Sequence, residues 1–151
     1  MNSDERTNRD WQYIIAMARQ LSSLNEKMFT AALDKGDSRL RAAALLSAVK
    51  YKEKYVPELI DRVGDDDVFV CQCSRHSLAV ISNMYLGGKQ YVDFGPLPND
   101  HAAAKNAASL MWKVWFDDMK DKKPIQKPAQ GKASTTAPKT QPQTQKAQPK
   151  K

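Results

Sequence analysis

The stretch DSRLRAAALLSAVKYKEKYVPELIDRVGDDDVFV, residues 37–70, decides which kind of fold this chain adopts. It opens with an aspartate followed by an alanine-rich segment, and this order predicts a helix capped by Asp37 or Ser38. Pro57 suits the first turn of the next helix, which we expect over residues 57–63. The stretch therefore predicts helices joined by a turn rather than a pair of strands.

The helical spacing of apolar residues continues on both sides of this stretch. Glu26 follows Ser23 by three residues, a capping box that predicts a helix start at Ser23. Asp67 is expected to cap a long helix, and Asn99 or Asp100 is expected to cap the last one. The expected helices cover residues 11–21, 24–35, 38–49, 57–63, 68–86 and 101–119.

One segment resembles a strand, residues 91–94, and it is too short and isolated to form a sheet. The chain is therefore predicted to be all-α. Residues 120–151 hold five of the eight prolines and one large apolar residue, Ile125, so they cannot bury enough surface to offset the entropy of ordering. We expect a flexible N-terminus over 1–8, a helical domain over 9–119, and a disordered tail beyond it.

The net charge also changes near residue 120. Residues 120–151 hold nine lysines and one aspartate, a net charge of +8. Residues 1–119 hold 15 basic and 16 acidic side chains, which leaves the body at −1. The body therefore lacks the excess positive charge that a globular nucleic-acid binder offers to phosphates. About 48% of the body is hydrophobic, an ordinary figure for one folded domain.

Several features bear on the compartment. No apolar run is long enough for a transmembrane helix, and the charged first ten residues lack the apolar region of a secretory signal. Cys71 and Cys73 lie two residues apart and cannot cross-link distant elements, which suits a reducing compartment. We therefore expect a cytoplasmic protein with no membrane partner.

The chain also contains a weak internal repeat with a period near 30 residues. A shift of this length aligns Asp37 with Asp67 and Ser47 with Ser77, together with most of the aliphatic and small residues between them. Alternating helices with such a period are what an α-solenoid requires, because each helix pair buries its apolar face on its neighbours.

Residues 37–44 followed by 55–63 resemble the short bacterial-type HEAT-like repeat. Its usual pattern is a capping aspartate, a valine–arginine pair, small residues, then proline, a leucine pair and another aspartate. Residues 65–70 begin a second copy, and the resemblance covers about residues 33–82. It implies a short right-handed α-solenoid of antiparallel helix pairs that works as a non-catalytic scaffold or protein-interaction module.

The resemblance also implies where a protein partner binds. The second helix of each pair, residues 38–49 and 68–86, would build the inner face of the solenoid. The polar residues expected to line that face are Arg39, Arg41, Gln72, Arg75 and His76. Some HEAT-like repeat proteins attach bilin chromophores, so an accessory subunit of an enzyme such as a bilin lyase is an alternative, although no residue set here supports it.

Cys71, Cys73 and His76 form the one cluster that points to metal or nucleophilic chemistry. On a helix the two cysteines lie about 200° apart and cannot share an ion. Cys73 and His76 can face one site, but two ligands fall short of the four that zinc usually takes. No group in the pattern orients the imidazole for nucleophilic catalysis. We therefore expect no catalytic residue, no cofactor and no metal ion.

The basic tail carries the main alternative function. Its lysines could contact the phosphates of a nucleic acid, or another polyanion, and release counterions. The candidate contacts are Lys122, Lys123, Lys127 and Lys132. The tail has no arginine or aromatic residue to stack on bases, so a solubilising tether is the simpler interpretation.

Two tryptophans close the body. Trp112 and Trp115 lie three residues apart in the last expected helix. Exposed tryptophans would make an anchor for a partner, whereas buried ones would seal the end of the helical stack. We expect burial of Trp112 or Trp115, because a monomer seldom exposes both.

Overall fold

The computed structural model describes residues 3–87 and 92–122, and every regular element in these ranges is a helix. The predicted all-α class is therefore confirmed for the described residues. The elements in chain order are α1 (Ser3–Ser23), α2 (Glu26–Lys35), α3 (Ser38–Ser47), the 3₁₀ helix η1 (Ala48–Tyr55), α4 (Val56–Arg62), α5 (Val68–Tyr85) and α6 (Ala102–Met119). Most of the expected tail, residues 123–151, lies outside these ranges.

The first helix is longer than expected. It begins at Ser3, so residues 3–8 of the expected N-terminal segment are helical. Two acidic residues, Asp4 and Glu5, occupy its first turn, where a negative charge interacts favourably with the helix dipole. Its first buried residue is Ile14, so propensity and charge, rather than burial, account for its first turns.

Two helix caps match the prediction. Asp37 Oδ1 accepts a hydrogen bond from Leu40 N at 2.9 Å at the start of α3. Asp67 Oδ1 accepts from the backbone N–H groups of Phe69 and Val70, at 2.9 and 3.1 Å, at the start of α5. Each carboxylate satisfies N–H groups that have no partner within the helix.

The cap predicted for the second helix is wrong. Ser23 is the last residue of α1, and its hydroxyl donates to Gln20 O at 2.8 Å. Asn25 caps α2 instead, because its Oδ1 accepts from Met28 N at 3.0 Å. The Glu26 carboxylate, which would complete a capping box, instead accepts hydrogen bonds from Lys54 Nζ and the Tyr55 hydroxyl.

The cap predicted for the last helix is also wrong. His101 caps α6 by accepting a hydrogen bond from Ala104 N on Nδ1 at 3.2 Å. Asp100 Oδ2 accepts from Leu97 N at 2.8 Å and so stabilises the turn before the helix. The Asp100 carboxylate therefore bonds to the turn that precedes α6 rather than to the first turn of the helix.

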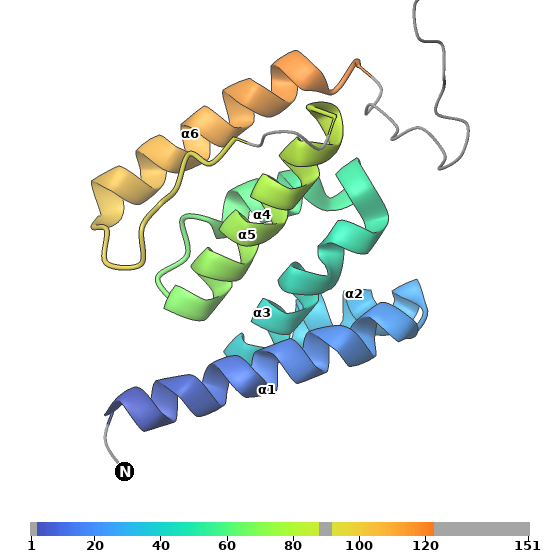
Figure 1. The fold of residues 1–151 in the computed structure, drawn as a ribbon, viewed down its shortest axis with the longest axis vertical. Coiled ribbons are helices and arrows are strands. Elements are labelled where there is room, and N and C mark those ends of the chain that lie inside the picture. The colour runs from blue at the N-terminus through green and yellow to red at the C-terminus, as the bar shows by residue number, and fades with distance from the viewer. Residues whose placement is uncertain (1–2, 88–91, 123–151) are drawn as a thin grey trace, which may run out of the picture.

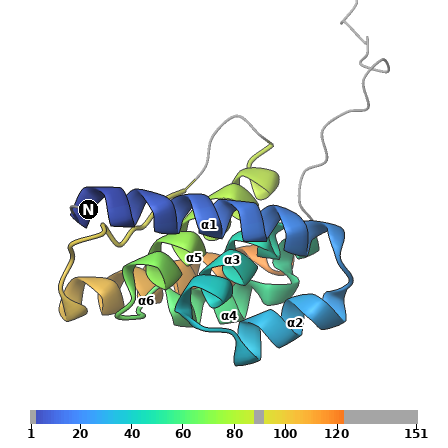
Figure 2. The ribbon, with the colours of Figure 1, turned by 90° about the horizontal axis from the view of Figure 1, so that it is seen from below.

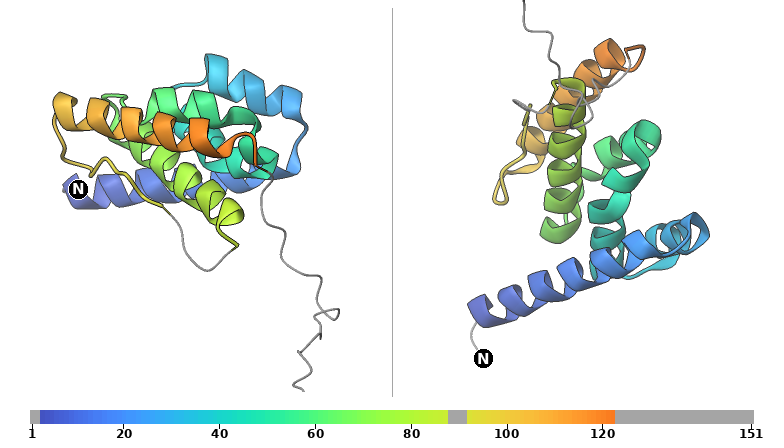
Figure 3. Two further views of the ribbon diagram at one scale, coloured as in Figure 1. Left: turned by 90° about the horizontal axis from the view of Figure 1, so that it is seen from above. Right: turned by 45° about the vertical axis from the view of Figure 1, so that its right-hand side comes forward.

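The helices pack in an order that follows the chain. Helix α1 packs on α3, and α3 packs on α5 (Figure 1). Helices α2, α4 and α6 lie along one side of this row (Figure 2), and α4 contacts both α5 and α6. The two ends of the stack are α1 and α6, with α3 and α5 between them (Figure 3).

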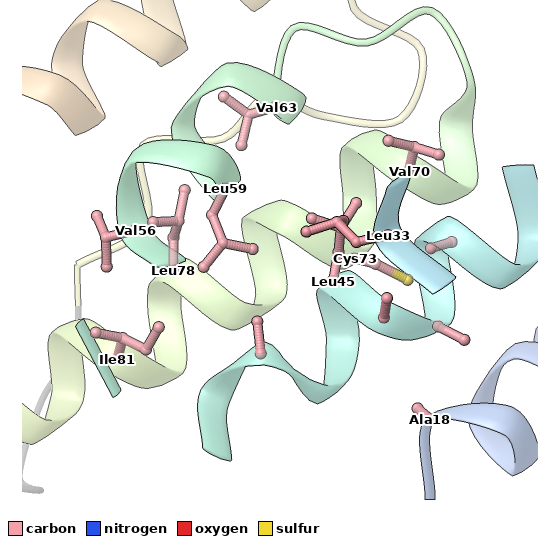
Figure 4. Close-up of a cluster of buried hydrophobic side chains, with 14 of the residues drawn as sticks. Ala18, Leu33, Leu45, Val56, Leu59, Val63, Val70, Cys73, Leu78 and Ile81 are labelled. Atoms are coloured by element: carbon pink, nitrogen blue, oxygen red, sulfur yellow. The ribbon is translucent and has the colours of Figure 1, made fainter. Parts of the chain in front are cut away.

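The core lies where α3, α4 and α5 meet. Leu45, Leu59 and Leu78, one from each helix, are at most 1% exposed and point into the same cluster (Figure 4). Three consecutive alanines of α3, residues 42–44, have no exposed surface, which allows neighbouring helices to approach closely. The alanine-rich segment is thus the centre of the fold.

Burial is predicted for one of the two tryptophans of α6, and both are buried. Trp112 has no exposed surface and Trp115 is 8% exposed. The Trp112 ring packs edge-on against Phe94, with centroids 5.0 Å apart, and its Nε1–H donates to Gly95 O at 2.9 Å. This pair of contacts attaches the segment before α6 to the helix itself.

Candidate functional site

An open groove of about 430 Å³ lies between α5 and the segment that precedes α6. Six of its seven lining residues come from α5 at helical spacing and therefore share one face of the helix. The seventh, Asp93, comes from the segment after the helix. The lining residues are Gln72, Arg75, His76, Ala79, Val80, Asn83 and Asp93.

An ion pair joins the two sides of the groove. Arg75 Nε and Nη2 donate to the two carboxylate oxygens of Asp93, each at 2.9 Å, in a bidentate pair. The third donor, Arg75 Nη1, donates to Gln72 Oε1 at 3.0 Å. The guanidinium is therefore held in one plane, with its charge matched by a partner.

The ionisation of this pair follows from its geometry. Partial burial raises the pKa of Asp93, but the hydrogen bonds from Arg75 and from the Gly95 N–H together outweigh this effect. The pKa of Asp93 therefore lies below its usual range. The hydrogen bond to Asp93 raises the pKa of Arg75. Both groups are therefore charged at neutral pH.

Further hydrogen bonds fix the wall of the groove. Gln72 Nε2 donates to Pro96 O at 2.9 Å, and Val92 N donates to the buried hydroxyl of Ser82 at 2.9 Å. Gly95 has φ +83°, a left-handed conformation that L side chains rarely adopt, so glycine suits the bend. The wall is thus attached to α5 at both of its ends and to α6 through the Gly95 carbonyl.

The groove combines apolar and polar groups. Ala79 and Val80 are half-buried and contribute apolar surface, whereas His76 is exposed at the edge. The arginine is already paired, so the fixed charges of the groove cancel locally. This composition suits a partner that supplies an apolar group with hydrogen-bonding edges rather than a strongly charged ligand.

Three of the five predicted partner-binding residues meet in this groove, namely Gln72, Arg75 and His76. The other two lie on α3 and do not line it. Arg39 pairs with Asp10 of α1 at 3.0 Å and stacks on the Tyr13 ring at 5.1 Å from its centroid. Arg41 is half-buried, and its Nε has no hydrogen-bond partner in the described part of the chain.

The sequence prediction missed the other four lining residues. Ala79, Val80 and Asn83 continue the spacing that begins at Gln72, so extension of the same helical face would have found them. Asp93 has no such signal, because its place in the groove depends on how the chain returns after α5. Of the polyanion candidates, Lys122 is exposed, and Lys123, Lys127 and Lys132 lie outside the described residues.

The two cysteines are buried thiols. Each is 1% exposed, and neither forms a disulfide. Burial raises the pKa of Cys71, whose thiol donates to Val63 O at 3.1 Å, and it raises the pKa of Cys73 to about 12. Both therefore stay protonated at neutral pH. Within the described ranges, no three His, Cys, Asp or Glu side chains are grouped so that they could hold a metal ion.

Two further findings concern membrane spans and similarity to known proteins. None of the helices in residues 3–87 and 92–122 combines the length and the apolar character needed to cross a membrane. The chain matches no protein-family model, no curated protein and no solved structure, so the groove and its surroundings are the basis on which a function is inferred.

Proposed function

We propose that this protein is a non-catalytic protein-interaction module of the HEAT-like type, and that its partner binds in the groove on α5. The groove carries this proposal, because it brings Gln72, Arg75 and His76 together beside the half-buried Ala79 and Val80. A surface that combines an apolar strip with fixed hydrogen-bonding groups is typical of protein recognition.

Two observations support the HEAT-like part of the proposal. The row of contacts from α1 to α3 to α5 is what a short solenoid of helix pairs requires. The capping aspartates of α3 and α5, Asp37 and Asp67, recur at the interval of the sequence repeat. A right-handed stack of antiparallel pairs remains part of the proposal.

The ionisation of the side chains supports a role without catalysis. The buried thiols are protonated, and a protonated thiol is a poor nucleophile. Arg75, the most strongly held cation of the groove, is neutralised by Asp93. Two buried thiols that cannot cross-link distant elements also suit a reducing, cytoplasmic setting.

A variant that fills the groove tests the proposal. His76→Trp adds bulk at an exposed position on the groove edge, whereas Lys27→Trp adds the same bulk at an exposed position on α2. Proteins captured from the source cells by each variant and by the parent chain are compared by quantitative mass spectrometry. We expect a specific set that the parent and Lys27→Trp capture and His76→Trp loses. An identical set for all three chains would contradict the groove as the binding site.

The segregation of charge supports a second proposal, polyanion binding through residues 120–151. Contacts with six or more duplex phosphates would give a slope of log affinity against log salt near −5 or steeper, from roughly −0.9 per contact. Deletion of 123–151 would abolish that slope, because the remaining body has no net positive charge to replace it. A slope that survives the deletion would assign the binding to the body.

A further inference from the structure

The outer face of α6 is apolar, although this helix forms one end of the stack (Figure 1). Leu110, Met111 and Val114 are 64%, 50% and 61% exposed. Ala103 and Ala107 are also exposed, and with Leu110 and Val114 they form a stripe at intervals of three and four residues. The stripe lies opposite Trp112, which faces the core.

The other end of the stack differs. The face of α1 opposite its buried Ile14 and Ala18 carries mainly polar and charged residues, namely Glu5, Gln12, Ala16, Arg19 and Ser23. In a repeat protein the terminal helices need a polar outer face to end the stack. Helix α1 meets this requirement and α6 does not.

We propose that the outer face of α6 binds the same face of a second copy of this chain, in an antiparallel arrangement that forms a two-fold dimer. A head-to-tail stack would place the apolar stripe of α6 on the polar face of α1, and its repetition would give an open filament. Contact between two α6 stripes instead buries apolar surface on both sides and closes after two copies.

Charge and side-chain size favour the antiparallel direction. A two-fold axis between Leu110 and Met111 sets Ala107 opposite Val114 and Ala103 opposite Asp118, so small residues face larger ones. Asp118 then lies beside the N-terminal end of the partner helix, whose first turn contains no acidic residue, whereas Asp117 is paired with Lys113 and Lys120, each at 3.5 Å. The positive end of a helix dipole stabilises such carboxylates. A parallel pair would instead bring the two Asp118 carboxylates together.

The C-terminal tail is a poorer occupant of the stripe. Its 32 residues contain one large apolar side chain, Ile125, and nine lysines. A segment of this composition offers little apolar surface to match three exposed aliphatic and thioether side chains. A second copy supplies an equal stripe.

Analytical ultracentrifugation of the full chain tests the dimer. The protein concentration is varied over roughly 5–300 μM, because an interface built on one helix is small and its affinity is expected to be weak. We expect a monomer–dimer equilibrium for the parent chain. In Leu110→Glu/Val114→Glu the dimer dissociation constant should rise at least about 100-fold, since like charges would meet in an apolar contact. The control Gln12→Glu/Ala16→Glu adds the same charges to the outer face of α1 and should dimerise like the parent.

Two outcomes would overturn the proposal. The first is a parent chain that stays monomeric over the whole range; if such a parent dimerises after deletion of 123–151, the stripe is assigned to the tail. The second is loss of association in the α1 control, which would indicate head-to-tail stacking. Far-UV circular dichroism checks that both double variants retain their helices.

Cysteine cross-linking tests the antiparallel register. Leu110→Cys lies beside its own copy at the axis and should form a disulfide between chains under mild oxidation. Ala103→Cys should not pair with itself, because the two sites would be about 22 Å apart along the helices. It should pair with Asp118→Cys when the two variants are mixed. Self-pairing of Ala103→Cys would overturn the antiparallel arrangement.

Discussion

Helices α3 and α5 begin alike and end differently. Each starts after a capping aspartate, and each places small, fully buried residues at equivalent positions, Ala43 and Ala44 in α3 and Cys73 and Ser74 in α5. Helix α3 becomes 3₁₀ after ten residues, whereas α5 continues through 18. The extra turns of α5 supply Ala79, Val80 and Asn83 to the groove, so the groove exists on one of two related helices because that helix is longer.

Each of the two helices has a serine at the equivalent position, and the two hydroxyls form different hydrogen bonds. Ser47 Oγ donates to Ala44 O within its own helix at 2.9 Å. Ser77 Oγ donates across the interface to Leu45 O at 2.7 Å. Ser77 therefore joins the two helices, whereas Ser47 stabilises the end of one.

The largest expected effect comes from giving α5 the smaller residue that stands at the equivalent position just after α3, at the start of η1. Leu78 is fully buried and aligns with Ala48. Leu78→Ala should lower the free energy of unfolding by about 2–5 kcal/mol, because it removes buried methyl groups and leaves a cavity. Urea denaturation measures the change. Val80→Ala, a half-buried control on the same helix, should cost much less, and equal losses for the two variants would contradict the packing described for α5.

A smaller effect is expected where the two helices are joined by a hydrogen bond. Ser77→Ala should lower the free energy of unfolding by about 1–2 kcal/mol, because the bond to Leu45 O is buried. The matched variant is Ser74→Ala. The Ser74 hydroxyl is fully buried and has no hydrogen-bond partner among the described residues, so its removal should leave stability unchanged or raise it. Thermal unfolding of both variants decides whether their signs differ in this way.

The segment after α3 offers a gain of stability. Lys52 has φ +55° and ψ −127°, a strained backbone conformation for a residue with a side chain. Lys52→Gly should therefore raise the free energy of unfolding by about 1 kcal/mol, as measured by urea denaturation. Lys52→Ala keeps the Cβ and removes the charge, so it should bring no comparable gain. A gain of equal size in both variants would show that charge, not backbone strain, is responsible.

The smallest effect concerns pH. Asp93 has a pKa below its ordinary value of 3.8, so its ion pair with Arg75 stabilises the fold above that pH and is lost as the pH falls through the lowered pKa. Asp93→Asn should cost less than about 1 kcal/mol near neutral pH, since the pair is partly exposed. The difference from the parent chain should disappear in strongly acidic solution. A difference that persists there would assign the effect to packing.

Local signals in the sequence predicted the parts of the fold that depend on local contacts. The Asp37 and Asp67 caps bond to N–H groups two or three residues away, so their pattern is visible in the sequence. The Ser23 cap failed because Asn25, two residues on, competes for the same role, and because Glu26 bonds to Tyr55 across the fold. Such competition is decided by tertiary contacts.

The candidate site shows the same division. Gln72, Arg75 and His76 share a helical face, so spacing alone places them together. The partner of Arg75 could not be predicted, because Asp93 lies 18 residues further along, beyond the end of α5, where helical spacing gives no signal. Arg39 was grouped with these residues by analogy between the helices, but its partner is Asp10 of α1.

The reactivity of the two buried cysteines can report on local unfolding around α5. Cys71 and Cys73 are protonated and inaccessible in α5, so a thiol reagent reaches them only when the packing around that helix opens. A cysteine introduced on the surface reacts at once and can carry a probe while the native pair stays unlabelled. The slow reaction of the native thiols then measures how often the centre of the protein opens, in the absence of denaturant.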